Sequence, residues 1–386
     1  MNVSRIPAVF MRGGIVKGLF FHYRDLPRAS ADRDRLLRRV VGEPDPRTGN
    51  ADGLGGVSGD ACRIVLVTPS LRDDCDVEFD AGIVRTGQAW IDYGDDCVDV
   101  AAAVGPFAIS ERLLPAIDGM HRVRVWQRGV GRRIDVLVPV HGSSVVEEGS
   151  FREDGVVFPS AEIRLEVFEP EPRPGARRVA LLPSGHVQDG LDVPGLGELR
   201  VTMLVADVPM VIVRAEALAL TGRETPDSLA KDRTLNTRVE AIRTRAATAM
   251  GLGRDLFGGP RAGPAWPRLA WVAPPCNYRA ATGVEIGAHE IDLMVRTFPT
   301  EGPHAMPGSA ESIALAAAAA LPGSVANEVA RTLPGVPTRL GHAAGTIAVG
   351  AELVRHAQGW RMEKALMSRG ARRLMSGIVH LPVVRT

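Results

Sequence analysis

Apolar positions along the chain form two kinds of run, which predict two kinds of element. Short apolar runs bounded by turn residues are typical of β-strands. In the first half of the chain they occur at residues 5–10, 18–21, 62–67, 77–79 and 88–91, which we expect to form one mixed or antiparallel sheet. A run of small residues from Asp99 to Leu114 is apolar on all sides, so it predicts a buried helix wrapped by these strands.

The second half of the chain repeats this plan. Strands are expected at residues 199–205, 210–213, 269–273 and 290–296, with an amphipathic helix at 235–250 and a second small-residue helix from Gly308 to Leu321. A proline- and charge-rich loop at residues 167–175 separates the two halves. The predicted fold class is therefore α+β, with two pseudo-symmetric domains that each wrap a central helix in a curved mixed sheet.

We place the boundary between the domains at residue 185. The N-terminal domain is expected to span residues 1–185, with a C-terminal strand at 377–386 as an optional addition, and the C-terminal domain residues 186–376. Under a pseudo-twofold arrangement the two central helices would point their N-termini at one ligand. Helix N-termini offer free N–H donors and a partial positive charge, so this arrangement suits carboxylates.

Composition narrows the class of protein. The 386 residues are enough for two domains with real cores. With 46 basic and 45 acidic residues the formal net charge is +1, which gives no electrostatic footprint for nucleic acid or an anionic membrane. The longest apolar stretch, residues 313–321, is shorter than the roughly 20 residues of a membrane span, and no signal-peptide pattern begins the chain. We expect a cytoplasmic protein that acts on small molecules.

The four cysteines, Cys62, Cys75, Cys97 and Cys276, show no CxxC spacing, so neither a metal site nor a disulfide framework is indicated. Cys97 comes shortly before a run of small apolar residues, at the first turn of the first predicted central helix. Free N–H groups and the helix dipole stabilise a thiolate at that position, which would make the cysteine a usable acid or base. The alternative is a small buried hydrophobic residue, since free cysteine is among the most buried residue types.

Several stretches, in order along nearly the whole chain, resemble the methylaconitate cis-trans isomerase (PrpF) family, whose relatives include oxalomesaconate and methylitaconate isomerases. The stretches are residues 5–14, 17–21, 52–56, 102–109, 220–224, 250–253, 272–275, 304–305, 339–342 and 371–375. The resemblance implies a diaminopimelate-epimerase-like pair of domains. It also implies cofactor-independent transfer of a proton across an allylic system in small di- and tricarboxylates.

The resemblance further implies a catalytic cysteine and lysine. The cysteine corresponds to Cys97, but the lysine position holds Arg63, which stays protonated and is a poor base. Asp96, beside Cys97, could pair with Arg63 or act as the base itself. The family's usual hydroxyls are replaced by Ile15 and Val16, and its Gly-Asn-Cys-Gly-Asn pattern by residues 94–99, where Asp95, Asp96 and Asp99 add carboxylates.

Substrate-binding candidates come from both halves. Positive charge could come from Arg12, Lys17 and Arg296, and further contacts from Ile15, Val16, His304 and Ser309, the last being equally suited to an N-cap. Two functions remain open. The chain is an isomerase or tautomerase of a small unsaturated carboxylic acid with an altered substrate and no cofactor, or it is a non-catalytic, accessory ligand-binding homologue. A homodimer is compatible with either.

Overall fold

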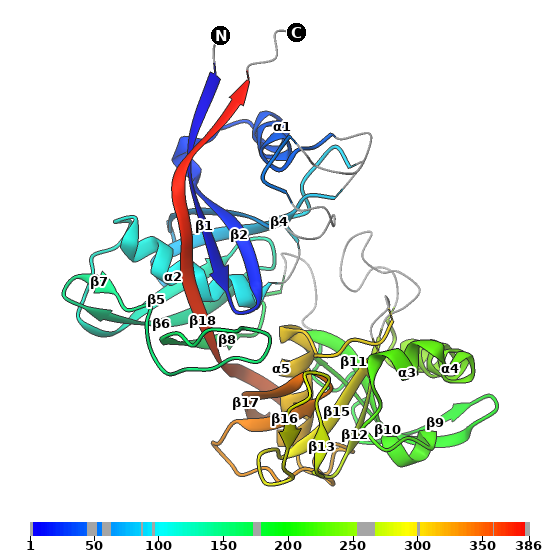
Figure 1. Cartoon of the computed structure of the whole chain (residues 1–386). Coiled ribbons are helices and arrows are strands. Elements are labelled where there is room, and N and C mark those ends of the chain that lie inside the picture. The colour runs from blue at the N-terminus through cyan, green and yellow to red at the C-terminus, as the bar shows by residue number, and fades with distance from the viewer. Residues whose placement is uncertain are drawn as a thin grey trace. The chain divides into compact units, whose positions relative to one another are not determined.

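The computed structural model describes residues 3–44, 52–55, 63–85, 88–94, 97–172, 179–252, 267–298, 302–357 and 359–382 (Figure 1). The chain divides into two compact units: an N-terminal unit of residues 1–170 with 368–386, and a C-terminal unit of residues 171–367. The last strand, β18 (Gly359–Pro382), contributes residues to both units. No helix in the described ranges is long and apolar enough to cross a membrane.

The sheet of the N-terminal unit closes on itself. Its strands are β1 (Val3–Gly13), β2 (Val16–His22), β3 (Arg63–Pro69), β4 (Val77–Ile83), β5 (Gly119–Gln127), β6 (Arg132–His141), β7 (Ser144–Val145), β8 (Glu162–Phe168) and the second part of β18. The order runs from β1 through β6 to β8 and β18, with β7 paired to β6. Antiparallel pairing from Val3 with Pro382 to Gly13 with Ala371 then joins β18 back to β1.

Helix α2 (Val98–Ser110) packs against β1, β2, β5, β6 and β8 of this closed sheet (Figure 1). Val98 and every residue from 100 to 109 are buried, which explains why the run is apolar on all sides. The helix ends four residues before the predicted Leu114. Arg112 adopts a left-handed conformation (φ 58°), and the N–H groups of Leu113 and Leu114 both donate to the Ala108 carbonyl. These contacts close the helix C-terminus.

The C-terminal unit is a second mixed sheet. Its strands are β9 (Asp189–Val193), β10 (Gly197–Ala206), β11 (Val208–Arg214), β12 (Arg268–Ala273), β15 (Leu293–Phe298), β16 (Thr338–His342), β17 (Gly345–His356) and the first part of β18, neighbours in that order. The short strands β13 (Tyr278–Arg279) and β14 (Glu285–Ile286) pair only with each other among the described strands.

Two long helices pack on this second sheet. Helix α4 (Arg233–Ala249) contacts β9 and β12, and helix α5 (Ser309–Ala320) contacts β10, β11, β16 and β17. The other helical elements in the described ranges are η1 (Tyr23–Asp25), α1 (Ser30–Val41), η2 (Ala215–Leu218) and α3 (Pro226–Lys231). The mixed, strand-rich character that the sequence predicts is confirmed.

The strand predicted at residues 88–91 is wrong. Residues 88–91 belong to no strand, and the isolated bridge to Ile83 of β4 is made by the next residue, Asp92. The Asp34 carboxylate of α1 accepts hydrogen bonds from the Ile91 N–H (3.4 Å) and the Tyr93 hydroxyl (3.1 Å). Side-chain anchoring to a helix therefore replaces the ladder of backbone bonds that a strand would need.

Candidate active site

Cys97 occupies the N-cap position of α2 and is buried, with 4% of its surface exposed. Burial raises the pKa of the Cys97 thiol to about 11, and the Asp99 carboxylate acts in the same direction. The Arg63 guanidinium and the backbone N–H groups of Val100 and Asp99 oppose this rise. The expected gain from the helix N-terminus is thus present but smaller than the cost of burial. At this pKa the Cys97 thiol is protonated near neutral pH.

Arg63 begins β3, where it pairs with Gly18 of β2 and Ile83 of β4. It is half-buried, and its charge is the strongest influence that lowers the pKa of Cys97. The structure therefore brings Arg63 into electrostatic reach of the thiol, although 34 positions separate them in the sequence. Asp95 and Asp96 lie outside the described residues, so the role of Asp96 stays a prediction.

The hairpin between β1 and β2 lies against the N-terminal end of α2, where Cys97 is located. Arg12 pairs with Lys17 and Gly13 with Val16, which leaves Gly14 and Ile15 at the turn. A Cβ on Gly13 would lie 2.4 Å from the Asp99 carbonyl oxygen, and one on Gly14 would lie 2.5 Å from Asp99 Oδ1. The glycine pair thus permits backbone contact with the first turn of α2.

Four charged side chains, Arg12, Asp99, Glu153 and Arg369, gather at this end of α2. We call them the charge cluster. Arg369 Nε lies 2.5 Å from Asp99 Oδ1 and 3.4 Å from Glu153 Oε1, and Arg12 Nη1 lies 3.9 Å from Glu153 Oε2. Burial raises the pKa of Glu153, while the neighbouring Arg369 lowers it. Two cations and two carboxylates therefore balance one another beside Cys97.

Backbone hydrogen bonds hold the charge cluster together. The Gly370 N–H donates to Glu153 Oε2 (3.0 Å), and the Gly14 N–H donates to the Gly370 carbonyl (2.8 Å). Arg12 Nη1 donates to the carbonyl oxygens of Gly14 (2.5 Å) and Gly370 (3.4 Å). Burial lowers the pKa of Arg12. Arg12, predicted as a substrate ligand, thus already has partners within the protein.

Sequence reasoning missed Glu153 and Arg369. Arg369 is 270 positions from its partner Asp99, and only the pairing of β18 with β1 brings it to α2. The sequence carries no local signal for this contact. Lys17 and Ile15, by contrast, are exposed at the hairpin, and Val16 is half-buried.

The candidates from the second half of the chain all lie in the C-terminal unit. His304 is exposed in the loop before α5, and Ser309 is the buried first residue of α5. Gly308, not Ser309, holds the N-cap position, and its N–H donates to Glu311 Oε2 (2.9 Å). Capping of α5 therefore does not depend on the Ser309 side chain.

Arg296 is buried within β15, and burial lowers its pKa. Its guanidinium donates to the carbonyl oxygens of Glu224 (2.8 Å), Val295 (2.7 Å) and Gly341 (3.4 Å). These bonds join β15 to the loop before α3 and to β16. Arg296 therefore has a structural role in its own unit, whatever else it contacts.

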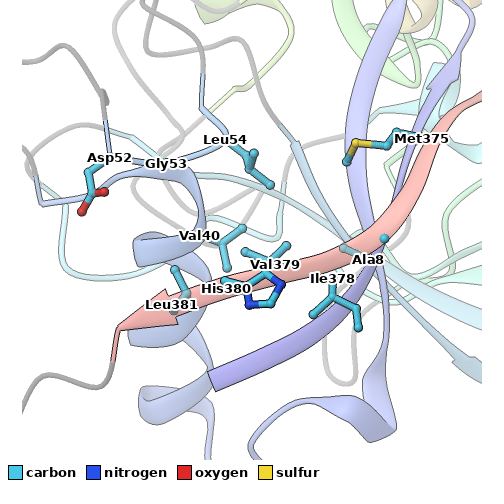
Figure 2. Close-up of a pocket in the computed structure, with 11 residues that line it drawn as sticks. Ala8, Val40, Asp52, Gly53, Leu54, Met375, Ile378, Val379, His380 and Leu381 are labelled. Carbon is cyan, nitrogen blue, oxygen red and sulfur yellow. The ribbon is translucent and has the colours of Figure 1, made fainter. Parts of the chain in front are cut away.

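A cavity of about 330 Å³ opens elsewhere in the N-terminal unit (Figure 2). Its lining combines Ala8 of β1, Val40 of α1, the loop residues 52–54 and the segment of β18 from Met375 to Leu381. Ala8 is five residues from Gly13 along β1, a distance of about 16 Å in a strand. This cavity is therefore separate from the Cys97 end of α2.

A family model described as PrpF protein matches residues 3–382, nearly the whole chain. This chain belongs to the PrpF family. It is 37% identical to 2-methyl-aconitate isomerase of Shewanella oneidensis and 38% identical to that of Cupriavidus necator, with 98% of this chain and 97% of each relative covered. A solved structure of methylitaconate-delta-isomerase matches it with a TM-score of 0.86 at 29% identity, over 99% of this chain and 96% of that one.

Membership of the PrpF family fits the geometry at α2. The relatives are named as isomerases of small carboxylic acids. A buried thiol with an arginine in electrostatic reach can donate a proton and stabilise the negative charge that develops in such a reaction. Arg63 cannot supply a neutral amine, so a base of the lysine type is missing at this position.

Proposed function

We propose that this PrpF-family protein is an isomerase that moves a proton within a small unsaturated carboxylic acid, without a cofactor. The observation that carries the proposal is the thiol of Cys97, which is buried at the N-terminus of α2 within electrostatic reach of Arg63. The isomerase names of relatives at 37–38% identity support the same reaction class.

The proposed reaction is a proton shift across an allylic system. A carboxylate base, for which we propose Asp96, removes a proton from the carbon at one end, and the electron pair moves through the double bond. Cys97 then gives its proton to the carbon at the other end. Arg63 stabilises the enolate-like intermediate and the thiolate that Cys97 leaves behind. Proton exchange with Asp96 or water restores both groups, so no net proton is consumed.

We further propose a substrate other than 2-methylaconitate. Ile15 and Val16 provide no hydroxyl at the hairpin turn, and Arg12 and Arg296 already donate to backbone carbonyls. Lys17 and His304 are exposed, so they are the better-placed candidates for contacts with a carboxylate, with Ser309 as an additional one. Fewer available donors suit a less anionic acid than a tricarboxylate.

We also propose that the two units are the pseudo-symmetric halves of a diaminopimelate-epimerase-like fold. Each contains one small-residue helix, α2 or α5, in which nearly all residues are buried. Each helix packs against several strands of its own sheet. An internal duplication accounts for this shared plan.

Deuterium incorporation tests the proposed function. An enzyme that removes a C–H proton incorporates deuterium from heavy water into its substrate, even at equilibrium. Purified protein is incubated in heavy water with 2-methylaconitate, methylitaconate, 4-oxalomesaconate and their mono- and dicarboxylate analogues, and exchange is followed by proton NMR. We expect exchange with at least one of these acids, and exchange about two to four orders of magnitude slower with Cys97→Ser as the matched control. Binding of an acid by calorimetry without exchange would overturn the proposal in favour of an accessory, non-catalytic protein.

A further inference from the structure

Asp99 poses an electrostatic problem at the proposed site. It lies in the first turn of α2, two residues after Cys97, and its carboxylate acts to raise the pKa of the thiol. A like charge beside a cysteine disfavours the thiolate. An uncompensated Asp99 would therefore oppose both loss of the Cys97 proton and the approach of an anionic substrate.

Arg369 places a positive charge next to the Asp99 carboxylate. Its side chain is 4% exposed, and it contacts the carboxylates of Asp99 (2.5 Å) and Glu153 (3.4 Å) through the same Nε atom. Its Nη1 donates to the Ser368 carbonyl (3.0 Å), and the adjacent Gly370 N–H donates to Glu153. The guanidinium is thus fixed to β18 while it holds the first turn of α2.

The position of Arg369 in the chain adds to its importance. The C-terminal unit ends at Met367, and β18 continues into the N-terminal unit from Ser368. Arg369 is the second residue after that crossing. Through Asp99 it joins the crossing strand to the helix that presents Cys97.

We infer that Arg369 is a positioning residue for Cys97, which fixes the first turn of α2 to β18 and offsets part of the Asp99 charge beside the thiol. Among the residues that the structure describes, the charged groups around this end of α2 include Arg63 on β3, Asp99 on α2, Arg12 on β1, Glu153 in the loop before β8, and Arg369 on β18, with Arg372 of β18 acting on Arg12. The consequence for catalysis rests on the proposed function, whereas the consequence for the thiol does not.

The test measures the Cys97 thiol in the absence of substrate. The full chain is alkylated with iodoacetamide between pH 7 and 10.5, and labelling of each cysteine is quantified by peptide mass spectrometry. Because only the thiolate reacts, a pKa rise of one unit slows labelling tenfold below the pKa. Cys75 is the internal reference, since it is also buried in the N-terminal unit and burial also raises its pKa to about 11.

Four variants separate charge from structure. We expect Arg369→Met to slow Cys97 labelling at pH 9 about tenfold and Asp99→Asn to speed it about tenfold, the size of a nearby-charge effect. The double variant Arg369→Met/Asp99→Asn should return to within about threefold of the unchanged protein. Arg339→Met, which removes an arginine paired with Asp292 (2.6 Å) in the C-terminal unit, should leave Cys97 labelling unchanged.

Two results would overturn the inference. One is an Arg369→Met variant in which Cys97 and Cys75 labelling rise together, because that shows general loosening of the unit. The other is an Asp99→Asn variant with an unchanged Cys97 profile, which remains measurable even where Arg369→Met does not fold. If no acid exchanges deuterium, the proposed function is contradicted. The thiol measurements would still test the role of Arg369, because they use no substrate.

Discussion

Substitution of Gly13 by alanine probes the contact between β1 and the first turn of α2. The new Cβ would lie 2.4 Å from the Asp99 carbonyl oxygen and 3.2 Å from the Ala103 backbone nitrogen. Ordinary contacts need about 3.5 Å, so the strand and the helix would have to part by about 1 Å. Both of these atoms are backbone, and the third close atom, Ala103 Cβ at 3.3 Å, is attached directly to the backbone, so no flexible side chain can move aside. Overpacking of this kind costs about 2–3 kcal/mol of unfolding free energy.

The assay is thermal unfolding, with Gly377→Ala as the matched control. Gly377 pairs with Ala8 between the same two strands, and a Cβ there would meet no heavy atom within 4 Å. A loss of about 2–3 kcal/mol corresponds to a Tm decrease of about 5–10 °C for a unit of this size. Gly377→Ala should change Tm by less than about 2 °C, and upward if at all, because alanine restricts the unfolded chain. Equal Tm values for the two variants would refute the reasoning.

Three further predictions concern catalysis. Cys97→Ser should keep the Tm and slow deuterium exchange by about two to four orders of magnitude, the usual share of a positioned proton donor; unchanged exchange would exclude Cys97 from the mechanism. Arg63→Lys should not confer 2-methylaconitate isomerisation, followed by NMR, because Ile15 and Val16 still supply no hydroxyl; robust activity would show that one lost base explains the divergence. With Cys97 as the acid, kcat/KM should stay level from neutral pH and fall as the pH rises through about 11, since burial raises the thiol pKa to that value; a fall near pH 8 would contradict this assignment.

The same pKa shift affects stability. Folding favours the neutral thiol, because the folded pKa lies above the unfolded one. The stability from this group is therefore fully present below the ordinary thiol pKa and is lost as the pH rises through about 11. Urea unfolding at pH 8 and pH 10.5, compared between the unchanged protein and Cys97→Ser, measures this contribution.

The elements of the fold that depend on local pattern could be predicted from the sequence. The small-residue runs predict α2 and α5 to within a few residues, since a helix that is apolar on all sides must be buried. The strands β10, β11 and β12 follow from short apolar runs between turn residues. The strand predicted at residues 88–91 is wrong because of a tertiary contact: the Ile91 N–H donates to the Asp34 carboxylate of α1 and not to a neighbouring strand.

The charge cluster could not be predicted, because its contacts are long-range. Of the 46 basic residues only Lys17, Lys231 and Lys364 are lysines, so one more arginine in the sequence carries little information. The contact between Arg369 and Asp99 forms only because β18 pairs with β1, and this pairing cannot be read from the residues around Arg369. Glu153 is likewise defined by its contacts with Arg369 and the Gly370 N–H, not by any motif around it.

The carboxylate of Asp99 shows how the structure changes a conclusion that the sequence favours. The sequence places an added negative charge beside Cys97, which suggests that the pocket repels anions. In the structure Asp99 is paired with Arg369 and packed against Gly14, so part of its charge is offset before any ligand arrives, although it still acts to raise the thiol pKa. The Arg63 cation lowers the pKa of the Cys97 thiol, whereas burial raises it. A substrate carboxylate near Arg63 would weaken that influence and raise the pKa further, so ligand binding itself would hold Cys97 in the protonated form that a proton donor needs.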